Sequence, residues 1–94
     1  MNRPAIRRTI LEAIARRAPA PTRLADLARD PDVVFLRMSE PQLAAECAEL
    51  EDRAYLENLK NRARPVWNGI TGAARDQLDM SGQLDPALWG DAAL

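Results

Sequence analysis

The stretch SEPQLAAECAELEDRAYLENLKNRARPVWNGIT, residues 39–71, decides the fold. Its first half predicts a helix that begins at Ser39, because serine is a favoured N-cap and Pro41 in the first turn needs no N–H partner. Apolar residues recur at helical spacing and predict one buried stripe: Leu43, Cys47, Leu50 and Ala54. The other side of this helix is expected to carry Gln42, Ala45, Glu46, Glu49 and Asp52.

Two apolar segments follow this helix and predict an antiparallel hairpin. Tyr55–Leu59 is typical of a strand, and Pro65–Ile70 of the return strand, since proline is tolerated where a strand begins. The connecting segment Lys60–Arg64, here called the basic loop, carries the cations of the hairpin. Thr71 then predicts the N-cap of a further helix that runs to about Met80.

The residues before this stretch predict two more helices. Asn2 is a suitable cap for the first, which carries isoleucine and leucine at helical spacing and ends near Ala18, before two prolines. Thr22 is expected to cap a short second helix that ends at 30–32. Residues 33–38 are apolar, and their pattern fits either a short strand or an irregular buried turn.

Two local patterns resemble the winged helix-turn-helix superfamily. Leu50-Glu51-Asp52-Arg53-Ala54-Tyr55-Leu56 is similar to the passage from recognition helix to wing, L-E-x-x-G-Y-L/I. Ile70-Thr71-Gly72-Ala73-Ala74-Arg75, with Leu78, is similar to the passage from wing to last helix, L/I-T-x-x-G-R-x-x-L. Ala54 and Ala74 stand where the family often has glycine.

The resemblance covers about residues 4–80 and implies a mainly α fold with a small antiparallel β-hairpin. Its parts would be a three-helix core, a wing and a C-terminal helix, within a winged-helix domain of residues 1–80. Residues 81–94 would form a C-terminal tail, in which Asp85–Trp89 could make a short helical turn because Asp is a favoured cap and Pro86 suits the first position.

Charge alternates along the 94 residues, although the net charge is only −1. Residues 1–29 and 60–75 are basic, whereas residues 30–59 and the tail are acidic. The net charge therefore neither supports nor excludes nucleic-acid binding. The local distribution of charge is the relevant evidence.

Carried over by position, the resemblance implies a double-stranded DNA partner and a role in transcription regulation. Bases would face Ser39, Gln42, Ala45, Glu46 and Glu49, and phosphates would meet Lys60, Arg62 and Arg64. Gln42 could pair with adenine and Glu46 with cytosine. However, the acids of this helix would repel phosphates. The arginines of the first helix fit either a solvated face or a phosphate-facing one.

The alternative is a winged-helix protein-interaction module without DNA binding. Its contact surface, to a protein partner or a second copy, would comprise Glu46, Glu49 and Trp89. Aromatic side chains are enriched at interfaces. Trp89 could also dock on its own domain, or lie in a disordered tail.

Catalytic and metal-binding patterns are lacking. The sequence has no histidine, one cysteine and no glycine-rich phosphate loop, so we expect no enzyme, no metal and no cofactor. Cys47 lies on the predicted apolar stripe, where an inert buried thiol is expected. Apolar runs fall short of the ~20 residues that span a bilayer, so we expect no membrane partner and a cytoplasmic protein.

Overall fold

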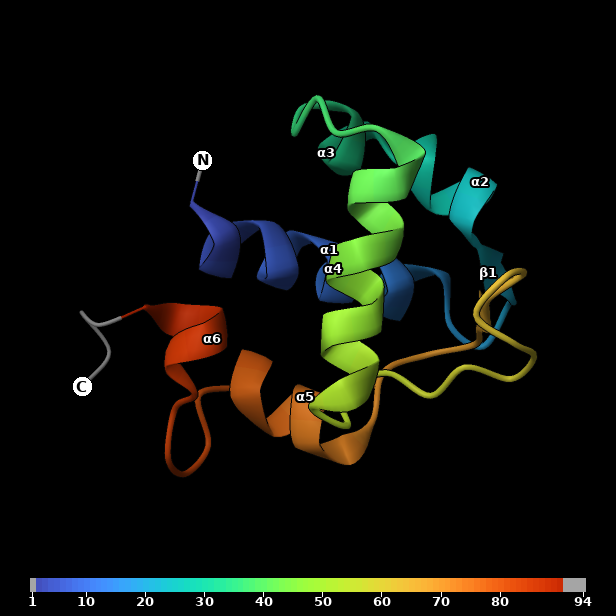
Figure 1. Cartoon of the computed structure of the whole chain (residues 1–94). Coiled ribbons are helices and arrows are strands. Elements are labelled where there is room, and N and C mark those ends of the chain that lie inside the picture. The colour runs from blue at the N-terminus through green and yellow to red at the C-terminus, as the bar shows by residue number, and fades with distance from the viewer. Residues whose placement is uncertain (1, 91–94) are drawn as a thin grey trace.

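The computed structural model describes residues 2–90 (Figure 1). These residues are mainly helical with a two-stranded antiparallel sheet, as expected. The elements are, in order, α1 (Arg3–Arg17), β1 (Thr22–Arg23), α2 (Leu24–Ala28), α3 (Pro31–Val34), α4 (Glu40–Asp52), β2 (Val66–Trp67), α5 (Gly72–Leu78) and α6 (Pro86–Trp89).

Helix α4 crosses α1 near the middle of the molecule, and the core lies where they meet (Figure 1). Helix α6 packs on α1, and α2 packs on α4. Trp67 of β2 is fully buried, and its Nε1 donates a hydrogen bond to Glu51 Oε2 over 3.3 Å. The largest fully buried side chains of the helices are Ile10, Leu11, Ile14, Leu27, Leu43, Leu50 and Leu88.

Helices α1, α4 and α5 begin at the caps that the sequence predicts. Asn2 Oδ1 accepts from the Ala5 N–H, and Thr71 Oγ1 accepts from the Ala74 N–H. At α4, Ser39 Oγ accepts from the Gln42 N–H while Gln42 Oε1 accepts from the Ser39 N–H, which is a reciprocal capping box. These short-range bonds satisfy N–H groups that have no partner inside the helix.

The end of α4 is a left-handed turn formed without glycine. Ala54 has φ +64°, its N–H donates to the Glu51 carbonyl, and the Tyr55 N–H donates to the Leu50 carbonyl. This pair of bonds is the Schellman motif, whose central residue is usually glycine. Ala54 is exposed, so the buried stripe of α4 ends at Leu50 and the prediction for Ala54 is wrong.

The predicted hairpin follows the expected path, but its arms do not form the regular sheet. They are joined by one bridge, Leu56 with Ile70, and by the bond from the Leu59 N–H to the Val66 carbonyl, while β2 pairs in register with β1. The cause is Asn58, whose side-chain oxygen accepts the Val66 N–H over 3.2 Å and so interrupts the ladder between the arms. The sheet therefore joins the return arm to a segment more than forty residues earlier in the chain.

Two expectations for the second helical region are corrected. Thr22 lies buried in β1, and Arg23 occupies the N-cap of α2, with the Asp26 carboxylate accepting its N–H. Residues 33–38 form neither a strand nor a buried turn. Val33 and Val34 end α3, and Phe35 is 82% exposed in the turn that follows.

The tail docks on the body of the molecule. Asp85 caps α6, as expected, and accepts a hydrogen bond from the Tyr55 hydroxyl. Burial, followed by this bond to Asp85, raises the pKa of Tyr55 to about 12. Leu88 is fully buried and the Arg8 guanidinium stacks 4.5 Å from the centroid of the Trp89 ring. Residues 91–94 of the predicted tail lie outside the described residues.

Candidate nucleic-acid interface

Glu46 lies between α4 and α1, not on an open face of α4. Its side chain is only 9% exposed and accepts hydrogen bonds from Arg7 Nε and Arg3 Nε, both over 3.1 Å. Arg7 is equally buried and also donates to the Ala87 carbonyl of α6. The prediction that Glu46 faces outward, toward bases or a partner, is therefore wrong, because the crossing of α1 covers that side of α4.

The charge state of Glu46 follows from these contacts. Burial raises the pKa of its carboxyl, but the hydrogen bonds and charges of Arg3 and Arg7 outweigh this effect. The net result is a pKa below the ordinary value, so Glu46 is ionised at neutral pH. Its negative charge is balanced inside the molecule by two guanidinium groups.

The other acids in the last two turns of α4 also have partners within the chain. Glu49 pairs with Arg53 at 3.0 Å, and Asp52 pairs with Arg62 at 2.6 Å. Arg62 therefore points back to α4, and this contact raises its pKa further. Of the three predicted phosphate contacts in the basic loop, Arg62 is the one already engaged by a carboxylate.

The predicted base-facing residues at the start of α4 are exposed but partly engaged. Ser39 and Gln42 form the capping box, so the Gln42 carboxamide oxygen already accepts a hydrogen bond of 2.8 Å. Its amino group has no protein partner among residues 2–90. Ala45, one turn further, is exposed and gives α4 a small, uncharged surface next to Gln42.

Most arginines of α1 form ion pairs or hydrogen bonds within the protein. Arg3 and Arg7 pair with Glu46, as described above. Arg16 Nη2 lies 3.1 Å from Asp30 and from Asp32, and Arg17 donates to the Thr22 hydroxyl. These contacts hold α1 against α4, α3 and β1. Arg16 and Arg17 remain exposed, in line with a solvated face, whereas Arg7 is buried and faces neither solvent nor a phosphate.

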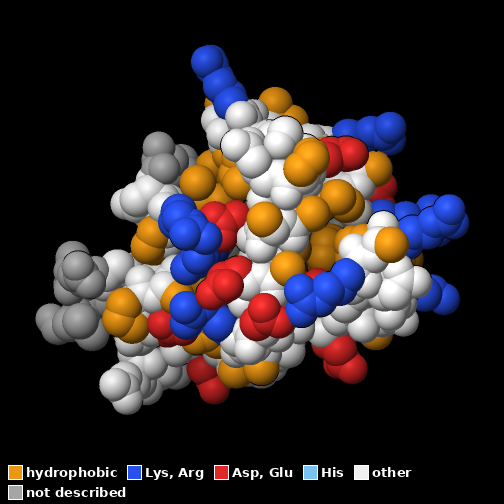
Figure 2. Space-filling model, in the orientation of Figure 1, with side chains coloured by type: hydrophobic (Ala, Val, Ile, Leu, Met, Phe, Trp, Pro, Cys, Tyr) orange, Lys and Arg blue, Asp and Glu red, His pale blue; other side chains and the backbone are white. Residues whose placement is uncertain are grey.

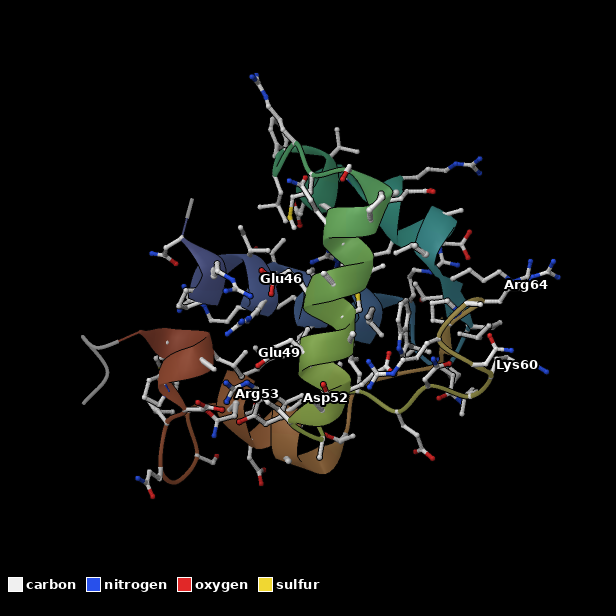
Figure 3. All side chains as sticks on the ribbon, in the orientation of Figure 1. Glu46, Glu49, Asp52, Arg53, Lys60 and Arg64 are labelled. Carbon is white, nitrogen blue, oxygen red and sulfur yellow. The ribbon has the colours of Figure 1, made fainter. Side chains whose placement is uncertain are left out.

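Three cations gather on the opposite side of α4 from Glu46. Among residues 2–90, the side chains of Arg23, Lys60 and Arg64 make no ion pair, and all three residues are exposed. Figure 3 shows Lys60 and Arg64 projecting from the basic loop, away from Glu46 and Glu49. In Figure 2, several blue side chains project from the surface along this edge.

The same three cations line a pocket of about 590 Å³, here called the basic pocket. Its remaining lining is apolar or amide, with no carboxylate among the described residues: Leu24, Ala25, Asn61, Ala63, Pro65 and Val66. One wall is the basic loop, and the other is the corner where β1 meets α2. The pairing of Arg23 with Val66 in the sheet brings the two walls together.

No sequence pattern indicated a role for Arg23. It lies in a two-residue strand, too short for a period, and follows a proline-rich turn. Its place beside Arg64 depends on the pairing of β1 with β2, which is a long-range contact. Lys60 and Arg64 were predicted because they stand close together in one loop.

The surface predicted for a protein partner is largely occupied. Glu46 is buried, Glu49 pairs with Arg53, and Trp89 is half-buried beneath Arg8. Trp89 Nε1 is buried and has no hydrogen-bond partner within residues 2–90. Exposed large apolar side chains lie elsewhere, at Val34, Phe35, Leu59 and Met80.

The described residues contain no cluster of Cys, Asp or Glu placed to hold a metal ion. Within the same range, every helix is too short or too polar to cross a bilayer. Cys47 is buried, and burial raises the pKa of its thiol to about 12. The thiol is therefore protonated at neutral pH, which leaves it a weak nucleophile.

Comparisons with known proteins assign no family to the chain. No protein-family model matches it, and neither a curated protein nor a solved structure is significantly similar to it. What this surface binds must follow from its own residues.

Proposed function

We propose that this chain is a DNA-binding module of the winged helix-turn-helix type, which grips the duplex backbone through Arg23, Lys60 and Arg64. The order of elements supports the fold. Helices α1, α2 and α4 are followed by a hairpin that carries the basic loop, and α5 comes after it. The short helix α3 fills the long connection before α4.

The observation that carries this proposal is the separation of charge around α4. Glu46, Glu49 and Asp52 are each held by arginines of the same chain. Arg23, Lys60 and Arg64, on the side of the basic loop, are held by no carboxylate among residues 2–90. A surface with unpaired guanidinium and ammonium groups attracts phosphates, because binding releases the counterions condensed on DNA.

The internal pairs also answer the electrostatic objection raised by the sequence. An acidic recognition helix repels DNA when its carboxylates are free. Here Glu46, Glu49 and Asp52 are compensated at distances near 3 Å, whereas Glu40 and Glu51 make no ion pair within residues 2–90, so the repulsive field of α4 is reduced but not removed. The repulsion falls accordingly.

Direct base reading is expected to be weak. Glu46 cannot reach cytosine, and the Gln42 oxygen that would accept from adenine is engaged at the cap. Phosphate contacts carry no sequence information by themselves. We therefore propose binding with little sequence preference, rather than recognition of one operator.

Fluorescence anisotropy with a labelled duplex of arbitrary sequence at 50 mM salt tests this proposal. The wild type should bind, and the double variant Arg23→Ala/Arg64→Ala should lose most of the affinity. The matched control is Arg29→Ala/Arg75→Ala, which removes the same charge from exposed arginines outside the basic pocket. If both double variants bind equally, or the wild type does not bind at micromolar protein, the proposal fails.

A second candidate, contact with a protein, is favoured by one observation. Val34 and Phe35 are adjacent and 56% and 82% exposed, at the end of α3. Sedimentation velocity over a range of concentrations would detect self-association through this site. It should disappear in Phe35→Ser, and a monomer at every concentration would count against a second copy as the partner.

A further inference from the structure

The basic pocket is concave, and its shape restricts the kind of ligand more than its charge does. Arg23 comes from the β1–α2 corner, whereas Lys60 and Arg64 come from the basic loop, so the residues that carry the three cations line one space from two walls. Its volume, about 590 Å³, lies within the range of roughly 300–1,000 Å³ that is typical of small-molecule sites. A flat cationic surface would suffice for a continuous backbone.

The basic loop is held in shape by asparagine side chains. Asn58 Oδ1 accepts from the N–H groups of Lys60 and Val66, and Asn61 Oδ1 accepts from those of Ala63 and Arg64. The Leu59 N–H adds a bond of 2.8 Å to the Val66 carbonyl. The loop wall is thus pre-organised, which lowers the cost of ordering it when a ligand binds.

The apolar part of the lining also bears on the ligand. Leu24, Pro65 and Val66 contribute carbon surface beside the three cations. Apolar surroundings strengthen the attraction between a cation and an anion, and they also offer contact to an uncharged group. The pocket therefore suits a ligand with a strongly charged end and a compact, uncharged body that offers some carbon surface.

We infer that the basic pocket binds the terminal nucleotide of a DNA strand through its phosphate monoester; this inference rests on the proposed function. A terminal monoester carries about −1.5 to −2 charges at neutral pH, against −1 for an internal diester. A strand that continues in both directions must cross the mouth of the pocket. A strand end can enter, with its phosphate on Arg23 and Arg64 and its sugar on Val66.

The test compares short duplexes of one sequence that differ only at their ends: hydroxyl at all termini, a 5′-phosphate, or a 3′-phosphate. An internal fluorophore reports binding by anisotropy. The terminal phosphate should tighten binding by about tenfold, the effect of one added charge-assisted hydrogen bond. The two phosphorylated duplexes show which strand end enters.

Single substitutions test whether the basic pocket causes the gain in affinity from the terminal phosphate. Arg23→Ala should abolish the gain from the terminal phosphate, and Lys60→Ala, as an independent check, should reduce it. Arg62→Ala is the matched control from the same loop, because Arg62 lies outside the pocket lining and pairs with Asp52. In that variant the ratio of affinities for phosphorylated and plain duplex should stay near the wild-type ratio.

Equal binding of all three duplexes would overturn the inference and leave the proposed function standing. A gain that survives Arg23→Ala would overturn the pocket as its cause. If no duplex binds at all, the proposed function itself fails. The inference then fails as well, so the two failures are distinguishable.

Discussion

The Arg62 guanidinium lies 2.6 Å from the Asp52 carboxylate, and this pair joins the basic loop to the last turn of α4. Both side chains are more than half exposed, so the pair contributes little to stability. Its effect is on charge, because it keeps one cation of the loop away from a phosphate. The structure thus separates the loop into one engaged cation and two free ones.

Asp52→Asn should therefore strengthen DNA binding by releasing Arg62. One additional phosphate contact makes the slope of log K against log salt more negative by about 0.9. Asp76→Asn is the control, since it makes the same charge change at an exposed position on α5. Anisotropy titrations at several salt concentrations measure both. Equal slopes in the two variants would show that Arg62 stays away from DNA even when it is free.

The buried pair of Arg7 and Glu46 should behave as a unit in stability. Glu46→Leu leaves the Arg7 charge buried and unpaired, which costs about 3–5 kcal/mol. Arg7→Met/Glu46→Leu removes both charges. Its free energy of unfolding should lie within about 1 kcal/mol of the wild-type value, or above it. Urea unfolding followed by circular dichroism distinguishes these outcomes. A double variant as unstable as the single one would mean that the Arg7 bond to the Ala87 carbonyl dominates.

Stability should also fall in acid. The pKa values of Glu46 and Asp85 are both lowered, in each case because hydrogen bonds to the carboxylate outweigh the effect of burial. A lowered carboxyl pKa stabilises the fold above the ordinary values of 4.5 and 3.8, and this contribution is lost as the pH falls through the lower, folded-state values.

Thermal unfolding from pH 7 to pH 2.5 measures this loss. Glu46→Gln should be less stable at pH 7 and should show a shallower decrease toward pH 2.5, because one of the two carboxyls no longer titrates. A decrease as steep as that of the wild type would exclude Glu46 as a cause of the acid sensitivity.

Ala54 offers a test of backbone strain. Its φ of +64° costs an L-residue roughly 1–2 kcal/mol, and glycine avoids this cost at the expense of some chain entropy. Ala54→Gly should therefore stabilise the protein by about 0.5–1 kcal/mol. Ala45→Gly, at an exposed position inside α4, should instead destabilise it by about 1 kcal/mol. Opposite shifts of the melting temperature are expected, and a decrease in both variants would contradict a left-handed Ala54.

The helices could be predicted from the sequence because their signals are local. Asn2, Ser39, Thr71 and Asp85 each act within three residues of their own position, and all four cap helices in the structure. The Schellman turn at Ala54 was harder to predict, because the sequence has alanine where such turns usually have glycine.

What the sequence could not supply depends on long-range contacts. Glu46 looked exposed because a helical wheel ignores neighbouring helices, and only the crossing of α1 brings Arg7 to it. The return arm does meet the predicted arm, at the Leu56–Ile70 bridge and the Leu59–Val66 bond, but its regular pairing with β1 was not predicted. For the same reason Arg23 was missing from the predicted site.

The salt dependence of duplex binding tests the central claim most directly. Three phosphate contacts, by Arg23, Lys60 and Arg64, predict a slope of log K against log salt of about −2.7, which is roughly a 40-fold loss of affinity between 50 and 200 mM. Each single alanine variant of these residues should make the slope less negative by about 0.9. A wild-type slope near zero, or one that none of the three substitutions changes, would contradict the claim that these cations bind DNA.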